Sequence, residues 1–502
     1  MKAQVTAHSR YTIADIDNRL YGSFLEHLGR AVYTGIYEPD HPTADENGMR
    51  RDVIDLVREL DTPICRYPGG NFVSAYNWED GIGPKEDRPT RLDLAWRTSE
   101  SNHVGIHEYA DWAEKANTEM MLALNLGSRD LDAARAFVEY VNHPGGTYWS
   151  DLRKSNGRAD PWGVKVWCLG NEMDGPWQIG HKSADEYGHL ANETAKALRA
   201  FDKSLELVVC GSSHSDMPSY PQWEATVLEH TYDQVDHISL HMYFENHEKN
   251  TAEFLALPEK LDRYIGTVSG IIDYVKSKSR SKRDVKISFD EWNVWYHERH
   301  NDAKRMAEWD WPHAPALLED IYNFEDVLQV GCILNTFIRR SDVVRIACIA
   351  QLVNVIAPIM TAPGGAAWRQ TIYYPFRFAS TMGRGTALQL DVACPTYNAD
   401  IASNVKFLDI AGVHDGDAGT LTFFAVNKSG EEVMEVDLAL ERFGTAKSVE
   451  HTLIRHDDLE ARNTEENPDT VTPRKSDGAK LADGGLALSL PPYSYSVIRV
   501  QL

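Results

Sequence analysis

Short apolar runs recur along the first 360 residues and alternate with amphipathic stretches. Runs without polar alternation indicate strands buried on both faces, and therefore parallel pairing. This order predicts an α/β fold, a (β/α)₈ TIM barrel. A doubly wound sheet is the alternative, disfavoured because no Gly-x-Gly-x-x-Gly follows the first strand. The predicted strands are 21–26, 63–67, 120–126, 164–170, 206–211, 236–242, 285–291 and an eighth within 343–360, and the predicted helices are 50–60, 105–117, 183–201 and 251–278.

The pattern changes near residue 378. From there to the end, stretches such as 419–428 and 433–440 alternate apolar and polar residues between Gly, Asp and Asn turns. This alternation is typical of half-buried antiparallel strands, so we predict a jelly-roll-like β-sandwich at 379–502 after a barrel at 18–378. We expect residues 1–17 to contribute a strand to the sandwich, and 457–485 to form a long loop.

Composition and charge narrow the class of partner. The formal net charge is −24, which disfavours nucleic acid and anionic membranes as partners. Six cysteines are scattered without a C-x-x-C, five of them in apolar runs, which indicates buried free thiols and a reducing compartment. No apolar leader and no stretch of about 18 apolar residues is visible, so a cytoplasmic enzyme is the simplest expectation.

Candidate chemistry lies where the predicted barrel strands end, which is where such barrels place their active sites. Glu172 and Glu291 each end a continuous apolar run. Two carboxylates from different strands are what retaining glycoside hydrolysis needs, one to protonate the leaving oxygen and one to attack the anomeric carbon. Other polar residues at strand ends are Arg66, Asn71, Asn171, His241 and Tyr243.

Several long motifs resemble glycoside hydrolase family 51, the arabinofuranosidases of a large retaining clan with (β/α)₈ barrels. The resemblance spans nearly the whole chain and implies a retaining, exo-acting α-L-arabinofuranosidase active on arabino-oligosaccharides, arabinoxylan or arabinan, a role in hemicellulose degradation, and a homo-hexamer. The motifs are Tyr21-Gly-Ser-Phe-Leu-Glu26, Arg66-Tyr-Pro-Gly-Gly-Asn71, Trp167-Cys-Leu-Gly-Asn171-Glu172, Asp290-Glu291-Trp292-Asn293-Val-Trp295 and Ala350-Gln351-Leu-Val-Asn354.

The resemblance also implies residue roles, with Glu172 as general acid/base and Glu291 as nucleophile. The predicted substrate-binding residues are Glu26, Arg66, Asn71, Trp96, Asn171, His241, Tyr243, Trp295 and Gln351. Two alternatives stay open, namely core packing for both tryptophans and a Glu26–Arg66 salt bridge at the barrel mouth. The stretch 99–109 departs from the family pattern at His103, His107 and Tyr109, which puts the pocket rim in question.

Rival functions are weaker on the sequence. Another retaining glycosidase of the clan, an endoglucanase or β-xylosidase, is the enzyme alternative, and a non-catalytic sugar-binding barrel is disfavoured because both glutamates are present. Ser212, Ser213, His214 and Asp216 lack the G-x-S-x-G of a serine nucleophile. Beside Glu298, His297 and His300 offer two imidazoles three residues apart, but no further ligand has the spacing of a metal site. We therefore predict no metal and no organic cofactor.

Overall fold

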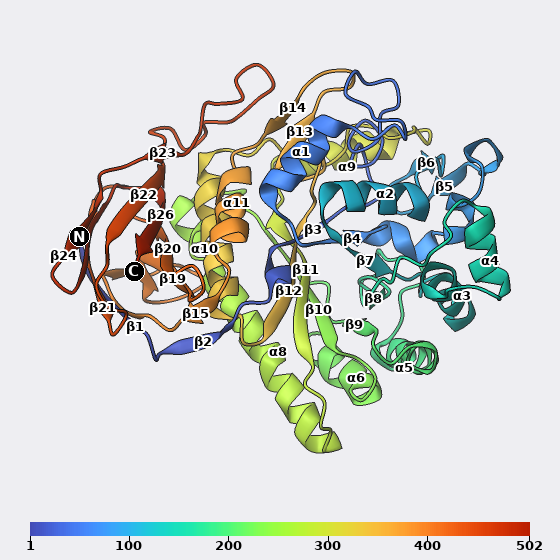
Figure 1. Cartoon of the computed structure of the whole chain (residues 1–502), viewed down its shortest axis with the longest axis horizontal. Helices are drawn as coiled ribbons and strands as arrows, with labels where there is room; N and C mark the ends of the chain where they lie inside the picture. The colour runs from blue at the N-terminus through green and yellow to red at the C-terminus, as the bar shows by residue number, and fades with distance from the viewer.

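Eight parallel strands close into a barrel (Figure 1). The computed structural model describes residues 1–502. Each strand pairs in parallel with its sequence neighbours, and the last pairs with the first, so the predicted (β/α)₈ barrel is confirmed. In chain order the strands are β3 (Gly22–Phe24), β4 (Ile64–Tyr67), β7 (Glu119–Ala123), β8 (Val166–Leu169), β9 (Glu206–Cys210), β10 (His237–Phe244), β11 (Lys286–Val294) and β12 (Val344–Ala350).

Helices surround this barrel and cover its outer face. The expected helix 251–278 is interrupted between α7 and α8, and Pro258 occupies the first turn of α8, a position that needs no backbone N–H. The helices are α1 (Arg51–Leu60), α2 (Ile106–Ala116), α3 (Leu131–Asn142), α4 (Tyr148–Ser155), α5 (Ala184–Phe201), α6 (Gln222–Thr231), α7 (Thr251–Phe254), α8 (Pro258–Ser279), α9 (Arg299–Glu308), α10 (Phe324–Arg339) and α11 (Tyr373–Met382). No helix is long and apolar enough to cross a membrane.

Two sheets packed face to face form the second part of the molecule. One has the order β16 (Asp391–Ala393), β1 (Lys2–His8), β21 (Met434–Glu441), β25 (Gly485–Leu490) and β24 (Ala479–Ala482). The other has the order β2 (Thr12–Asp15), β15 (Thr386–Leu388), β19 (Leu408–Asp415), β20 (Thr420–Asn427), β26 (Ser494–Gln501), β22 (Ser448–Ile454) and β23 (Arg474–Lys475). Short ribbons β5 (Arg91–Asp93) with β6 (Thr98–Glu100), β13 (Ile359–Thr361) with β14 (Ala367–Arg369), and β17 (Thr396–Tyr397) with β18 (Val405–Lys406) complete the strands.

The first strand of the chain lies inside this sandwich. β1 runs parallel to β21 and antiparallel to β16, while β2 pairs with β15. Both ends of the chain therefore lie in the sandwich (Figure 1). The pair of β1 with β21 is the one parallel pair in two otherwise antiparallel sheets. It joins a strand from the start of the chain to strands from its last third. The division of the chain into domains at 378/379 stays a prediction.

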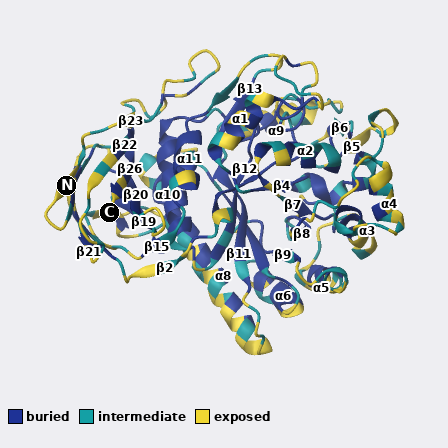
Figure 2. Ribbon diagram, viewed as in Figure 1, coloured by how far each residue is buried: buried dark blue, intermediate teal, exposed yellow.

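α10 joins the two parts. Its residues Phe324–Ile338 are all buried, and it packs against β19, β20 and β26 on one side and β11 on the other. Figure 2 shows this helix and the barrel strands as the most completely buried elements. The predicted loop 457–485 contains the short strands β23 and β24, and its first part contacts the start of α10 through Leu459 and Arg462.

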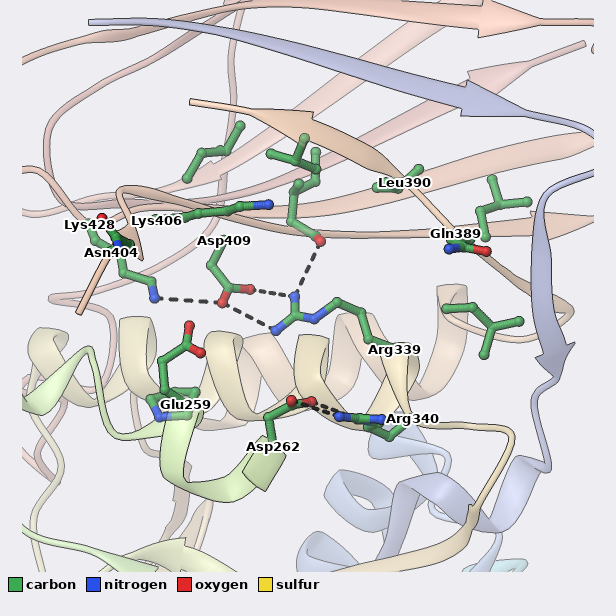
Figure 3. Close-up of a pocket in the computed structure, with 16 residues that line it drawn as sticks. Glu259, Asp262, Arg339, Arg340, Gln389, Leu390, Asn404, Lys406, Asp409 and Lys428 are labelled. Carbon is green, nitrogen blue, oxygen red and sulfur yellow. Dashed lines mark hydrogen bonds and ion pairs between the residues drawn. The ribbon is translucent and has the colours of Figure 1, made fainter. Parts of the chain in front are cut away.

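A hollow of about 510 Å³ lies at the junction of α8, the end of α10 and the seven-stranded sheet (Figure 3). Buried Asp409 accepts hydrogen bonds from Arg339 and Asn335 at 2.9 Å each, and the ammonium of Lys428 lies 3.7 Å from it. These contacts link α10 to the sandwich by charge as well as by apolar packing.

Candidate active site

The polar residues predicted from strand ends converge on one mouth of the barrel. They come from the carboxyl ends of six strands or from the residues that follow them, as expected for parallel strands in a closed barrel. Arg66 lies in β4, His241 and Tyr243 in β10, and Glu291 in β11, while Glu26 follows β3, Asn171 and Glu172 follow β8, and Gln351 follows β12.

Glu172 and Glu291 lie side by side around one imidazole. His241 Nδ1 is 2.8 Å from Glu172 Oε1 and 3.5 Å from Glu291 Oε2. One oxygen of each carboxylate and one ring nitrogen of His241 all lie within 4.8 Å of one another. Oxygens this close favour the roughly 5–5.5 Å between carboxyl groups of retaining glycosidases over the roughly 6.5–9.5 Å of inverting ones.

The local backbone of Glu172 is unusual. Its φ is +43°, in the left-handed region that residues with a side chain rarely adopt. Burial raises the pKa of Glu172, and the neighbouring charge of Glu291 acts in the same direction. Hydrogen bonds from His241 and Trp177 oppose this rise without cancelling it. A carboxyl group with a raised pKa can hold a proton for donation at neutral pH.

His241 is fixed from both sides. Its Nε2 lies 2.9 Å from Asp290 Oδ1, so both ring nitrogens face carboxylates. Burial by itself lowers the pKa of His241, but the charge of Glu291 and the hydrogen bonds to Asp290 and Glu172 raise it to about 10. Glu172, His241 and Glu291 lie close enough to hold a metal ion, yet a metal would first have to displace a tightly held proton from Nδ1.

Glu291 receives two further donors. Arg66 Nη1 donates to Oε1 at 2.7 Å and the Tyr243 hydroxyl donates to Oε2 at 2.8 Å. The second nitrogen of the Arg66 fork, Nη2, donates to Asn171 Oδ1 at 2.6 Å. Donors at both oxygens stabilise negative charge on this carboxylate. Because both terminal nitrogens of Arg66 donate to Glu291 and Asn171, the alternative of a Glu26–Arg66 salt bridge is wrong.

Glu26 is a buried carboxyl group in the wall of the site. Its Oε1 accepts from the Phe72 N–H at 2.8 Å and from Trp96 Nε1 at 3.1 Å, and its Oε2 accepts from Gln351 Nε2 at 3.2 Å. A Cβ on Gly70 would approach Glu26 Oε2 to 2.7 Å, so only glycine allows this close contact. Burial raises the pKa of Glu26 to about 8.

A cavity of about 710 Å³ opens above these residues. This is within the roughly 300–1,000 Å³ typical of small-molecule sites. Its wall includes Glu26, Asn71, Trp96, Glu172, Tyr243, Glu291, Trp295 and Gln351 from the predicted set. Trp96 and Trp295 therefore border open space as well as core. The other predicted binding residues, Arg66, Asn171 and His241, are buried beneath the wall and contact residues of the wall.

The sequence interpretation assigned no role to several residues of the cavity wall. Trp177 follows Glu172 by five residues and donates its indole N–H to Glu172 Oε2 at 2.7 Å. Ser213, His214 and Asp216 also line the cavity, but the Ser213 hydroxyl donates to Asp174, so no serine–histidine pair forms. The available signal was position alone, because Trp177 follows strand β8, as Glu172 does, and Ser213, His214 and Asp216 follow strand β9.

Other residues singled out in the sequence lie away from the cavity. Tyr109 donates to the Cys65 carbonyl at 2.7 Å beneath β4, and His107 contacts the Tyr140 hydroxyl at 2.6 Å. The three residues at which 99–109 departs from the family pattern therefore do not line the cavity, and the third of them, His103, is exposed. His297 pairs with Asp326 at 2.9 Å. All six cysteines are free, and all but Cys394 are buried, as predicted.

Comparison with known proteins agrees with the site. The family models "Alpha-L-arabinofuranosidase 1 domain" and "Alpha-L-arabinofuranosidase C-terminal domain" match residues 56–264 and 290–494. A solved family 51 α-L-arabinofuranosidase from Bifidobacterium longum superposes with a TM-score of 0.95 and 43% identity over 99% of each chain. The chain belongs to glycoside hydrolase family 51. The predicted resemblance is confirmed.

Other relatives match along the full chain. An "Intracellular exo-alpha-(1->5)-L-arabinofuranosidase 1" from Bacillus subtilis (strain 168) is 53% identical over 500 residues, which is 100% of this chain and 99% of the relative. An "Exo-alpha-(1->6)-L-arabinofuranosidase" from Bifidobacterium longum is 45% identical over 100% of this chain and 97% of the relative. A bifunctional glucanase-xylanase from a metagenome library is only 12% identical, with a TM-score of 0.61, and shares the fold alone.

Proposed function

We propose that this family 51 enzyme is a retaining, exo-acting α-L-arabinofuranosidase that removes terminal non-reducing arabinofuranosyl groups. The observation that supports this best is the pair Glu172 and Glu291, held within 4.8 Å of each other around His241. Retaining hydrolysis needs two such carboxyl groups in different environments. Here the pKa of Glu172 is raised, whereas Glu291 accepts hydrogen bonds from Arg66 and Tyr243.

In the first step, Glu291 attacks the anomeric carbon and the bond to the leaving oxygen breaks. The proton on Glu172 passes to that oxygen, so the leaving group departs as a neutral alcohol. In the second step, the Glu172 carboxylate takes a proton from a water molecule, which attacks the same carbon and releases Glu291. Two inversions give arabinose with the configuration of the substrate.

The part of the cavity next to Glu26 is the arabinofuranose site in this proposal. Glu26, Asn71, Tyr243 and Gln351 supply polar groups for the sugar hydroxyls, and Trp96 and Trp295 supply flat apolar walls. Arg66 and His241 hold the carboxyls beneath, and buried Asn171 holds Arg66. Relatives named exo-arabinofuranosidases, which extend along the whole chain, favour exo over endo action.

The natural substrate follows from the relatives' names and the cavity together. We infer that short α-linked arabino-oligosaccharides are hydrolysed in the cytoplasm, with arabinan and arabinoxylan as the ultimate polymer sources. Relatives named for (1→5) and (1→6) linkages leave linkage preference to experiment. A homo-hexamer is part of the proposal on family resemblance. We propose no metal or organic cofactor.

Three substrates test this function. The wild-type enzyme should hydrolyse 4-nitrophenyl α-L-arabinofuranoside and leave the matching β-D-xyloside and carboxymethylcellulose nearly untouched. Proton NMR of the first minutes of reaction should show the α-anomer of arabinose before mutarotation. Preference for the xyloside or the cellulose derivative would favour the alternative clan activities, and a first-formed β-anomer would refute retention.

A further inference from the structure

A second cavity of the molecule lies at the junction of barrel and sandwich. This junction hollow has a volume of about 510 Å³, within the roughly 300–1,000 Å³ typical of small-molecule sites. α8 and the end of α10 form one wall, and the seven-stranded sheet forms the other (Figure 3). The hollow shares no residue with the wall of the active-site cavity. A ligand bound here would therefore occupy a site separate from the catalytic one.

The wall of the hollow carries more positive than negative side chains. Its basic residues are Arg339, Arg340, Lys406 and Lys428, and its acidic residues are Glu259, Asp262 and Asp409. The hollow thus has an excess of one positive charge, in a chain whose formal net charge is −24. A concave wall with an excess of one sign of charge attracts a ligand of the opposite sign. Charge therefore favours an anion over a cation in this hollow.

Both arginines of the hollow have a carboxylate partner. Arg339 donates to Asp409 at 2.9 Å. Arg340 donates to Asp262 through Nε at 2.6 Å and through Nη2 at 2.7 Å, which leaves its Nη1 without a hydrogen bond. The acids Asp262 and Asp409 are thus each engaged by an arginine.

Lys428 is the basic residue without a partner of its own. Its side chain is 2% exposed, and its ammonium lies 3.7 Å from Asp409, too far for a hydrogen bond. Lys428 and Arg339 therefore share one negative charge, and none of the three N–H donors of the ammonium is hydrogen-bonded. Buried ammonium groups are normally paired and hydrogen-bonded, because an unpaired buried charge is costly. Lys428 borders the hollow, so a ligand there can supply the acceptors (Figure 3).

We propose that the junction hollow binds a small anion that carries a phosphate group, either inorganic phosphate or a phosphorylated sugar, with Lys428 as its central contact. This site is independent of the proposed hydrolase function. Phosphate oxygens accept hydrogen bonds from several directions, and a lysine ammonium binds them as a point charge. The anion supplies both the acceptors and the negative charge that Lys428 lacks. Since Lys428 belongs to the sandwich and Arg340 follows α10, the bound anion bridges the two parts of the molecule.

Two amide side chains favour the phosphorylated sugar. Gln389 and Asn404 line the hollow, and only their backbone groups are hydrogen-bonded within the protein. A side-chain amide both donates and accepts hydrogen bonds, as does a sugar hydroxyl. We therefore expect a sugar phosphate to bind more tightly than phosphate alone.

Glu259 allows a test of the sign of the ligand's charge. It lies in the first turn of α8 and lines the hollow, and no basic side chain forms an ion pair with it. Its negative charge opposes an anion in the hollow. Glu259→Gln should therefore tighten phosphate binding by about 2- to 10-fold. The same change would weaken the binding of a cation.

Isothermal titration calorimetry of the full chain with inorganic phosphate, ribose 5-phosphate and ribose, at constant ionic strength in chloride, tests the site. Both phosphates should bind the wild-type protein at one saturable site, and ribose should not. Lys428→Met should weaken both by about 10- to 100-fold, because it removes hydrogen bonds between charged groups. Lys480→Met, at an exposed position of β24, is the matched control and should change the affinity by less than about 2-fold.

A second variant covers the case in which Lys428→Met does not fold, which thermal unfolding in chloride would show. Arg340→Met removes a more exposed cation of the same wall. This variant should fold and should weaken phosphate binding by about 3-fold or more. Tighter binding of ribose 5-phosphate than of phosphate would support a phosphorylated sugar as the ligand, and equal binding would support inorganic phosphate.

Three results would overturn the proposal. The first is the absence of saturable binding by both phosphates in the wild-type protein. The second is unchanged affinity in the folded lysine and arginine variants, which would place the anion elsewhere. The third is weaker phosphate binding in Glu259→Gln, because the loss of a negative charge cannot weaken an anion site through charge.

Discussion

Tyr243 donates its hydroxyl to Glu291 Oε2 at 2.8 Å, on the carboxylate that Arg66 already contacts at its other oxygen. Burial raises the pKa of this tyrosine well above its usual value, and the charge of Glu291 raises it further. The hydroxyl therefore stays protonated across the working range. It acts as a fixed donor to the nucleophile in every state of the reaction.

Removing that hydroxyl should slow the reaction without unfolding the protein. Tyr243→Phe should lower kcat/KM about 10- to 100-fold, because a hydrogen bond to a charged group contributes about 1.5–3 kcal/mol. Tyr264→Phe is the control, since its hydroxyl donates to the Ser212 carbonyl at 3.0 Å, outside the cavity wall. Steady-state kinetics on an aryl arabinofuranoside should show a change below about 3-fold for the control. Equal losses would mean that the Tyr243 contact is structural.

Azide should separate the two glutamates. Glu172→Ala lacks the proton donor and the later base, so 2,4-dinitrophenyl α-L-arabinofuranoside should still arabinosylate Glu291 while release slows. Azide needs no base, and should restore turnover and give the α-azide by NMR. Glu291→Ala should fail on every substrate by the double-displacement route. A β-azide from Glu172→Ala would contradict Glu291 as the nucleophile.

Chelation should not affect the enzyme. Glu172, His241 and Glu291 are close enough to hold an ion, but the pKa of about 10 at His241 disfavours loss of its proton to a metal at neutral pH. Activity should survive exhaustive dialysis against EDTA in full, and metal analysis of the dialysed enzyme verifies the removal. Loss of activity that zinc or calcium restores would contradict the two-carboxylate mechanism.

Stability should depend on pH through Glu26. Its pKa rises from 4.5 to about 8 on folding, so the folded state favours the protonated form. The contribution of Glu26 to stability is thus complete below about pH 4.5 and is lost as pH rises towards about 8, at up to about 1.4 kcal/mol per pH unit. Glu26→Gln should flatten this slope in urea unfolding between pH 5 and 8, relative to wild type, to the extent of roughly one proton. Glu466→Gln, at an exposed position, should keep the wild-type slope, and an unchanged slope in Glu26→Gln would contradict the assignment.

The junction of barrel and sandwich should depend on Asp409. Asp409→Asn leaves Arg339 and buried Lys428 without their shared anion, which should cost about 3–5 kcal/mol of unfolding free energy. Asp262→Asn breaks the more exposed pair with Arg340 in the same hollow (Figure 3). That change should cost about 0–1 kcal/mol. Urea midpoints compare the two, and equal costs would show that burial does not decide the effect.

The barrel and its catalytic strands were predictable because continuous apolar runs occur at regular spacing and motifs lie at their ends. α10 was not among the predicted helices, although its residues Phe324–Ile338 are all buried. Glu172, Glu291, His241 and Tyr243 converge because parallel strands end at one mouth. Which partner each takes is a matter of tertiary distance, so Arg66 pairing with Glu291 and not Glu26 was beyond sequence reasoning.

Trp177 and the other loop residues of the cavity wall were hard to predict for the same reason. Loops that follow strands carry no periodic signal, and their side chains become a wall only when neighbouring loops meet. The contact between Asp174 and Ser213 that joins two such loops links residues far apart in sequence. The fold class therefore followed from local patterns, whereas the contacts between loops required the assembled structure.

The parallel pair of β1 with β21 places Lys2 opposite Glu435. During biosynthesis, β1 must therefore wait for its partner strand to be translated. At about 5–20 residues per second, the ribosome needs roughly half a minute or more to deliver the partner of a strand that emerged first. During that interval β1 has unsatisfied edges on both sides, and an unpaired strand edge invites association with other nascent chains. Yield in a rapidly translating host should therefore depend on chaperones that shelter this segment, and moving β1 to follow β21 by circular permutation would remove the wait.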